Sequence, residues 1–296
     1  MKEPTATNNP YPAWVDDFVR LLAKGEALSP TSLTLPEHPS LTSDAPTALI
    51  FAPHPDDEVI IGGLPLRLRH ELNVNVVNVA VTFGSRLERR AGRWHELQNA
   101  CDYIGFGLVA AAEKGLEGIN LTARKQDPKR WSASVDAIAG ILSAHRPSIV
   151  FAPHADDWNQ THLGTHQLVL EALARCPGLT CRTVETEYWG AMDTPNLMVE
   201  SSAADVAELV TALSLHVGEV ARNPYHVRLP AWMVDNVRRG AELVGGQGGT
   251  APRFTFATLY RLRHWADGRL QQVLDRGRAL SSQDDLRPLF LTPTQN

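Results

Sequence analysis

The stretch Phe51-Ala52-Pro53-His54-Pro55-Asp56-Asp57-Glu58 places one imidazole and three carboxylates directly after the apolar residues 47–50. The apolar residues predict a buried strand, and a helix is expected from about residue 58. In open α/β sheets, ligands and catalytic groups gather where a strand gives way to a helix. We therefore expect a functional site at this turn.

A near copy of the stretch, Phe151-Ala152-Pro153-His154-x-Asp156-Asp157, follows 100 positions later and precedes His162 and His166. The chain therefore brings clusters of imidazoles and carboxylates to two strand ends. Carboxylates at a helix start can simply cap the helix. Capping requires neither the preceding histidine nor the repeat, so the pattern favours a metal site.

The rest of the chain alternates apolar strands with helices, which predicts a Rossmann-like α/β fold, a mostly parallel sheet with helices on both faces. We expect a single α/β domain over residues 45–296, preceded by an arm with one helix over residues 1–44, and a long loop over 113–130. The predicted strands are 48–53, 75–82, 108–112, 148–153, 183–189 and 254–261, and the predicted helices are 58–71, 93–104, 132–145, 161–175, 204–217, 231–243 and 266–278.

The composition excludes several classes of protein. The 296 residues carry a net charge of −5, and their cationic clusters are short and lack interleaved aromatic residues, so we expect no nucleic-acid partner. The N-terminus has no apolar signal core and no run of eighteen apolar residues occurs, which predicts a cytoplasmic protein without membrane association. Three cysteines argue against a disulfide framework.

Imidazole and carboxylate ligands completed by a further histidine are typical of catalytic zinc, which keeps one coordination position open for water. Zinc lowers the pKa of that water and polarises a bound carbonyl. For the third ligand we rank His162 first because it lies near the start of a helix beside the second motif, then His166, then His154. The same ligands also suit iron, manganese or cobalt.

The motifs resemble the PIG-L/LmbE-like family of zinc-dependent deacetylases, which remove acetyl groups from N-acetylglucosamine-containing substrates. The first motif, Ala52-x-His54-Pro55-Asp56-Asp57-Glu58, is close to the family signature, and residues 153–162 are similar to its downstream segment. Arg93-x-x-Glu96 is similar to the helix motif of the family. The resemblance covers roughly residues 48–216.

The resemblance implies one Zn²⁺ per chain, with His54, Asp57 and His162 as ligands and Asp56 as general base. It also implies that Arg93 faces the substrate and that His216 is an active-site histidine. The substrate would be a small N-acylated sugar or conjugate. The oligomeric state stays open, and a homo-oligomer is compatible with the sequence.

The second motif departs from the family, which usually has a His-Asp dyad where this chain has Asn159 and Thr161. We therefore expect Asp56 to serve as base and then as proton donor, with Asn159 or His216 helping to hold the oxyanion.

Three other functions are alternatives to the deacetylase hypothesis. The enzyme could be an amidase acting on a thiol or secondary-metabolite conjugate, or the chain could be a zinc-containing binding protein that has lost turnover. A dinucleotide enzyme is disfavoured because the first strand-to-helix turn carries carboxylates, which would repel a pyrophosphate.

Overall fold

A mixed sheet of nine strands forms the centre of the protein, for which a computed structural model describes residues 9–28, 33–188 and 190–291. The strand order is β3-β2-β1-β4-β5-β7-β6-β9, and β8 pairs with β7. The first five strands are parallel, and β7 is antiparallel to its neighbours. The strands are β1 (Thr47–Ala52), β2 (Asn75–Ala80), β3 (Gly107–Ala110), β4 (Ile149–Pro153), β5 (Cys181–Thr186), β6 (Leu197–Ser201), β7 (Phe256–Ala266), β8 (Arg269–Gln272) and β9 (Arg278–Leu280).

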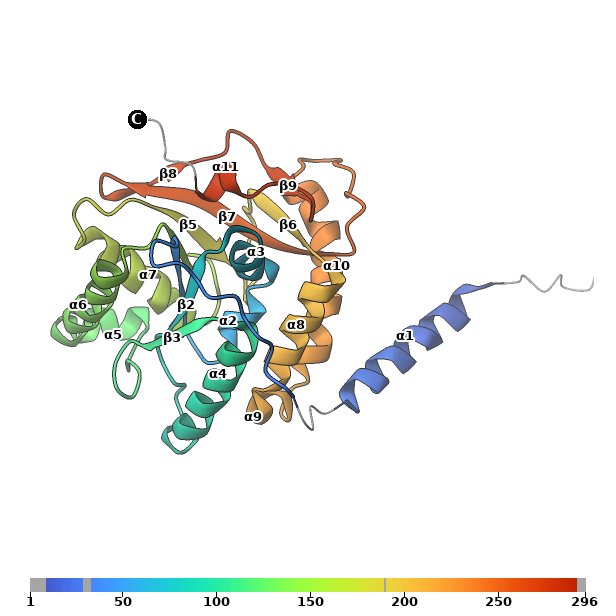
Figure 1. The fold of residues 1–296 in the computed structure, drawn as a ribbon, viewed down its shortest axis with the longest axis horizontal. Coiled ribbons are helices and arrows are strands. Elements are labelled where there is room, and N and C mark those ends of the chain that lie inside the picture. Colours follow the sequence, from blue (N-terminus) through green and yellow to red (C-terminus); the bar gives the residue numbers. More distant parts are fainter. Residues whose placement is uncertain (1–8, 29–32, 189, 292–296) are drawn as a thin grey trace, which may run out of the picture.

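Helices cover both faces of this sheet, which confirms the predicted Rossmann-like α/β fold (Figure 1). One face carries α5 (Leu121–Gln126), α6 (Pro128–His145) and α7 (Gln160–Ala174). The other face carries α3 (Gly63–Leu72), α4 (Arg90–Ile104), α8 (Ala203–Ser214) and α10 (Tyr225–Leu243). The shorter helices are α2 (Asp57–Ile60), η1 (Leu87–Arg89), α9 (Val217–Val220) and α11 (Arg287–Phe290).

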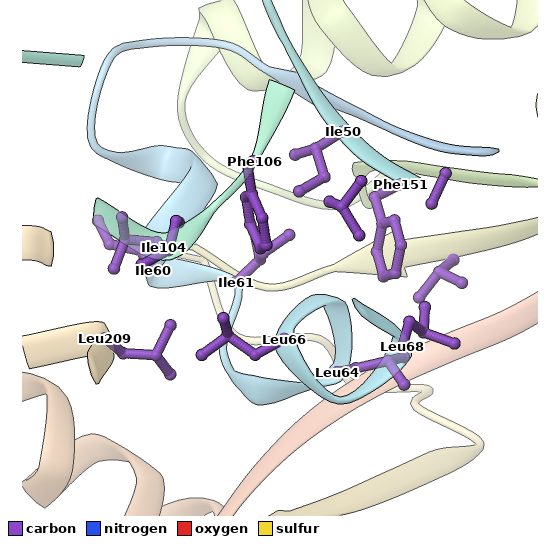
Figure 2. Close-up of a cluster of buried hydrophobic side chains, with 14 of the residues drawn as sticks. Ile50, Ile60, Ile61, Leu64, Leu66, Leu68, Ile104, Phe106, Phe151 and Leu209 are labelled. Atoms are coloured by element: carbon purple, nitrogen blue, oxygen red, sulfur yellow. The ribbon is translucent and has the colours of Figure 1, made fainter. Parts of the chain in front are cut away.

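Strand β1 contributes side chains to the hydrophobic core on each face of the sheet, because successive side chains of a strand point to opposite faces. Ile50 packs with the α3 and α4 side, where Figure 2 shows it with Phe151, Ile61 and Leu64. Its neighbours Leu49 and Phe51 pack with the α6 and α7 side. Both faces of β1 are therefore buried from Ala48 to Ala52, and the turn with the first motif follows directly.

The order of the sheet reverses between β1 and β4, which lie side by side and parallel. From this point the chain builds β2 and β3 on one side and β5 on the other. Parallel strands end at the same edge of a sheet, so the turns after β1 and β4 meet there. Such a switch point is where open α/β sheets bind their ligands.

The predicted helix over 58–71 is two helices, because Gly62 breaks the segment with a φ of 85°. A Cβ at this position would also lie 2.1 Å from Oγ1 of Thr258. Only glycine tolerates this combination of backbone conformation and close approach. The break separates α2, which carries the first motif, from α3, which packs in the core.

The predicted loop over 113–130 contains α5 and the start of α6. Asn120 caps α5, since its Oδ1 accepts a hydrogen bond from the N–H of Ala123 at 2.7 Å. Asp127 caps α6 in the same way, directly before Pro128. The caps were present in the sequence, but α5 has no buried residue and the first turn of α6 is polar, so no apolar periodicity marks either within 113–130.

The predicted helix over 266–278 is wrong, because the segment forms a hairpin between β7 and β8. Asp267 and Gly268 lie at its tip with φ values of 52° and 71°. Asp-Gly is a strong signal for a two-residue hairpin loop, in which both residues take positive φ. The helical spacing of apolar residues beyond Ala266 was the weaker of two competing signals.

The remaining boundaries shift by several residues. Helix α4 begins at Arg90 instead of 93, and α10 begins at Tyr225 instead of 231. Strand β5 covers Cys181–Thr186 against a predicted 183–189, and position 189 lies outside the described residues. Strand β6 and helix α11 were not predicted. His216, expected inside a helix, lies between α8 and α9.

The N-terminal helix α1 (Tyr11–Glu26) extends away from the body, and none of its residues is buried (Figure 1). Its C-terminal end contacts α10, where Nη2 of Arg228 lies 3.3 Å from Oε1 of Glu26. The division of the chain at residue 44 stays a prediction. Within the described residues, no helix combines the length and apolar character needed to cross a bilayer.

Arg67 ties α3 to the C-terminal segment, and its replacement by methionine should destabilise the protein. The guanidinium is 1% exposed and donates to Glu71 at 2.6 Å and to the carbonyls of Ser281 and Asp284 at 3.0 and 3.2 Å. We expect Arg67→Met to lower the free energy of unfolding by about 3 kcal/mol, since buried acceptors lose their donor. Chemical denaturation measures this.

Arg228→Met is the matched control, because the Arg228–Glu26 pair is exposed and should contribute less than about 1 kcal/mol. Equal losses in the two variants would contradict the structural role assigned to Arg67.

Candidate metal centre

The first motif forms a tight turn at the carboxyl end of β1. Asp56 has a φ of 111°, a left-handed conformation that aspartate adopts more readily than most residues, and α2 starts at the next residue. The turn buries three successive carboxylates, with Asp56 5%, Asp57 0% and Glu58 1% exposed. Because buried carboxylates need charged or hydrogen-bonding partners, each must be accounted for.

Three donor atoms converge at this turn, and they come from the ligand residues that the resemblance implied. Nδ1 of His54 lies 3.3 Å from Oδ2 of Asp57. Nε2 of His162, on α7, lies 3.3 Å from Nδ1 of His54 and 3.4 Å from Oδ2 of Asp57. The helix after β4 thus delivers its histidine to the turn after β1.

The triangle of donors has the dimensions that a tetrahedral divalent ion requires. Ligand atoms at the zinc distances of about 2.0–2.1 Å lie about 3.3–3.4 Å apart at tetrahedral angles. The second carboxylate oxygen of Asp57, Oδ1, is buried and has no hydrogen-bond partner among the described residues. Both the spacing and this unpaired oxygen fit a metal ion bound by His54, Asp57 and His162.

Asp157 fixes the orientation of the His162 ring. Its Oδ2 lies 2.8 Å from Nδ1 of His162, and both side chains are fully buried. Because Nδ1 donates to the carboxylate, Nε2 is left as the lone-pair atom that faces His54 and Asp57. A carboxylate behind a ligating histidine fixes the tautomer and strengthens the ligand.

The other two candidate ligands, His154 and His166, form hydrogen bonds to the backbone. His154 donates from Nε2 to the carbonyl of Gly190 at 2.9 Å and accepts at Nδ1 from the N–H of Asp156 at 3.3 Å. Nδ1 of His166 lies 2.8 Å from the carbonyl oxygen of Pro153. The ranking of His162 above His166 and His154 as the third metal ligand stays a prediction.

Asp56 lies beside the metal triangle and faces Arg93. Nη2 of Arg93 is 3.7 Å from Oδ2 of Asp56 and donates to the carbonyl of Pro55 at 2.6 Å. Burial, reinforced by the charge of Asp57, raises the pKa of Asp56 well above its usual range, although Arg93 and His216 oppose the shift. A carboxylate with a raised pKa is suited to accept and return a proton.

Glu58 connects Asp56 to His216. Its Oε2 accepts the N–H of Asp56 at 2.9 Å, and its Oε1 lies 2.7 Å from Nε2 of His216. Burial lowers the pKa of His216, but the Glu58 carboxylate outweighs burial and raises it. His216 is fully buried behind Glu58 and does not line the cavity described next.

A cavity of about 1020 Å³ opens over the site, and His54, Asp56, Arg93, Asn159 and Thr161 line it. Oδ1 of Asn159 accepts the N–H of Thr161 at 2.9 Å and caps α7. The side-chain oxygen of Asn159 is therefore occupied, which leaves its amide NH₂ as the group available to a ligand.

Three residues of the site escaped the sequence interpretation. Glu58 and Asp157 lie within the two motifs, but their spacing does not reveal what they contact. Glu219 lines the cavity and pairs with two guanidinium groups. Its Oε1 lies 2.6 Å from Nη2 of Arg89 and 3.6 Å from Nε of Arg93. No sequence pattern pairs positions 89 and 219, since only tertiary folding brings them together.

Fold and site together define a class, the Rossmann-like α/β proteins with a His-Asp-His centre at the switch point of the sheet. Within that class, residues 49–173 match the model of the PIG-L family, described as GlcNAc-PI de-N-acetylase. This part of the chain is thus similar to the PIG-L family, which confirms the resemblance predicted from the two motifs. No curated protein matches the sequence.

Solved structures share the fold at low sequence identity. N,N'-diacetylchitobiose deacetylase from Pyrococcus horikoshii is 16% identical, with a TM-score of 0.51 and coverage of 87% of this chain and 94% of that one. A deacetylase of teicoplanin biosynthesis is 16% identical, with a TM-score of 0.53 and coverage of 75% and 99%.

A third structure with the same fold carries a different activity. The 4-carboxy-2-hydroxymuconate hydratase from Pseudomonas putida KT2440 is 16% identical, with a TM-score of 0.55 and coverage of 77% of this chain and 99% of that one. The fold alone therefore does not decide the reaction, and the function depends on the residues of the site.

Proposed function

We propose that the protein is a metal-dependent hydrolase that removes an acyl group, in the first instance acetyl, from the amide nitrogen of an amino sugar or its conjugate. The observation that carries this proposal is the triangle of Nδ1 of His54, Oδ2 of Asp57 and Nε2 of His162, with sides of 3.3, 3.3 and 3.4 Å. Asp56 at its edge supplies the group needed for proton transfer.

His54, Asp57 and His162 would hold the ion, and zinc is the metal that this ligand set and spacing favour. When bound, the ion activates water and polarises the amide carbonyl. Asp56 accepts a proton from the attacking water at its carboxylate and later returns it to the departing amine. Asp157 keeps Nε2 of His162 available by holding a proton on Nδ1.

Arg93 and Asn159 extend from the walls of the cavity and would contact the substrate. Arg93 carries the charge next to Asp56, and the NH₂ of Asn159 can donate a neutral hydrogen bond to the oxyanion. We assign His216 a positioning role, because it contacts Glu58 and reaches Asp56 only through that carboxylate. It takes the place of neither member of the missing dyad.

Two other functions remain candidates. An amidase acting on a thiol or secondary-metabolite conjugate would use the same residues with a larger acceptor group, for which the cavity of about 1020 Å³ has room. A zinc-containing binding protein without turnover would need the metal triangle but not the buried Asp56, whose presence favours an enzyme.

Incubation of the zinc-loaded chain with a panel of N-acetylated sugars, thiol conjugates and glycopeptides tests the proposal, with free amine as the readout. Release of amine from the sugars is the expected result. Release only from the larger conjugates would favour the amidase. Bound zinc without release across the panel would overturn hydrolysis and favour the binding protein.

Replacement of Asn159 by alanine should lower both stability and kcat, the latter because an oxyanion donor is lost, without moving the pH dependence. Loss of the α7 cap should lower the free energy of unfolding by about 1 kcal/mol. Asn159 does not titrate, so both limbs of the pH profile of kcat/KM should keep their positions. Denaturation and pH-rate measurements check the two effects.

Asn159→Asp provides the control, because it keeps the cap and adds a titrating group. A shifted limb in Asn159→Ala would show that Asn159 acts through a neighbouring acid or base, contrary to this assignment.

Location in the cytoplasm and a small-molecule substrate are the further parts of the proposal. The family match supports the small-molecule substrate, and three free, buried cysteines fit a reducing compartment.

A further inference from the structure

The cavity over the metal site is strongly cationic, although the protein as a whole carries a net charge of −5. Five arginines line it, and only three carboxylates do: Arg86, Arg89, Arg90, Arg93 and Arg222 against Asp56, Glu117 and Glu219. Gathering like charges is unfavourable unless something compensates, so the partners of each guanidinium decide what the cluster can do.

Glu219 serves three of these arginines at once. Its carboxylate, 3% exposed, forms ion pairs with Arg89 at 2.6 Å, with Arg93 at 3.6 Å and with Arg222. One negative charge cannot neutralise three guanidinium groups. The Arg222 side chain is 60% exposed, so part of its donor set faces outward.

Glu117 is shared in the same way. It pairs with Arg90 at 2.7 Å and also with Arg130, from outside the cavity, at 2.9 Å. The Arg86 side chain makes no ion pair or hydrogen bond with the described residues. The wall formed by η1, the start of α4 and the segment after α9 therefore keeps an excess of positive charge.

Outside the cavity, two exposed arginines each have an acid of their own, since Arg238 pairs with Asp235 at 2.7 Å and Arg175 with Asp136 at 2.5 Å. Guanidinium groups bind carboxylate and phosphate oxygens in a bidentate manner, and they retain their charge when partly buried. An anionic ligand would supply the negative charge that these arginines lack, since Glu219 and Glu117 are each shared among several guanidinium groups.

We propose that the cavity holds an anion subsite, formed by Arg86 and Arg222 with support from Arg89, and that the substrate carries a carboxylate or phosphate beside its amide. The inference rests on the proposed function, since it assigns a substrate class to the same cavity. The metal site would act on the acyl amide while the arginines bind the charged part of the acceptor.

The test compares substrates that differ only in charge. The probes are methyl N-acetyl-β-glucosaminide, its carboxymethyl counterpart and N-acetylglucosamine 1-phosphate, each with the zinc-loaded full chain. We expect kcat/KM to be at least about tenfold higher for an anionic probe than for the neutral one, with the advantage shrinking as salt is added. The two anionic probes distinguish a carboxylate from a phosphate.

Variants locate the subsite. Arg222→Gln and Arg86→Gln should bring the anionic-to-neutral ratio towards one while leaving the neutral probe within about twofold, and Arg222→Lys should restore part of the ratio. Arg238→Gln is the matched control, because Arg238 also pairs with an acid three residues away and its side chain is 74% exposed. Equal ratios in the wild type, or an equal change in Arg238→Gln, would overturn the subsite.

Calorimetric titration with glucosamine and glucosamine 1-phosphate separates this proposal from the proposed function, because binding does not depend on turnover. Tighter binding of the phosphate without any hydrolysis would overturn the hydrolase and support the subsite. Hydrolysis without a preference for anions would overturn the subsite alone. Neither hydrolysis nor preferential binding would overturn both.

Discussion

Replacing Asp56 by asparagine should reduce kcat by about 10²–10⁴-fold while one metal ion per chain stays bound. Asp56 lies at the edge of the donor triangle and does not belong to it, so the loss should fall on proton transfer. Amine release measures the first effect, and metal analysis of the dialysed protein measures the second.

Asparagine is the informative substitution because the backbone at Asp56 has a φ of 111°. Alanine would add strain at this position, whereas asparagine tolerates positive φ. Asp156→Asn is the control, since Asp156 occupies the same place in the second motif but is exposed, and should leave kcat unchanged. Loss of metal from Asp56→Asn would show that Asp56 and Asp57 had been assigned in the wrong order.

Replacing His162 by glutamine should abolish stoichiometric metal binding and activity together. His162 supplies one of the three donors and is fully buried, so solvent cannot easily substitute for it. Metal content after dialysis against a weak chelator is the direct measurement, and circular dichroism establishes that the variant is folded.

Two further variants should affect metal binding less than His162→Gln does. Asp157→Asn keeps all three ligands but weakens the acceptor behind His162, and it should reduce metal affinity by about 10–100-fold. His166→Gln should retain the metal, because Nδ1 of His166 is engaged by the carbonyl of Pro153. Metal retained in His162→Gln and lost in His166→Gln would assign the third ligand to His166.

Some signals in the sequence were more reliable than others. Apolar strands that alternate with helices predicted the parallel sheet, since buried strands must be apolar on both faces. The predicted helix over 266–278 was wrong because the Asp267-Gly268 turn is a stronger signal than the apolar spacing around it. The helices within 113–130 were not predicted, because α5 has no buried residue and the first turn of α6 is polar.

Local sequence carried the chemistry of the centre: His54, Asp56 and Asp57 are close together because they are near neighbours in one turn. The pairings between distant segments depended on the sheet order. Because β4 lies next to β1, His162 reaches Asp57, and Asp157 can hold it in place. The packing of α9 against α4 sets Glu219 beside Arg89 and Arg93, which no spacing along the chain could have revealed, whereas Arg222 is its neighbour three residues on. Residue types and turns are local properties of a sequence, whereas charge balance in a cavity is a property of the folded chain.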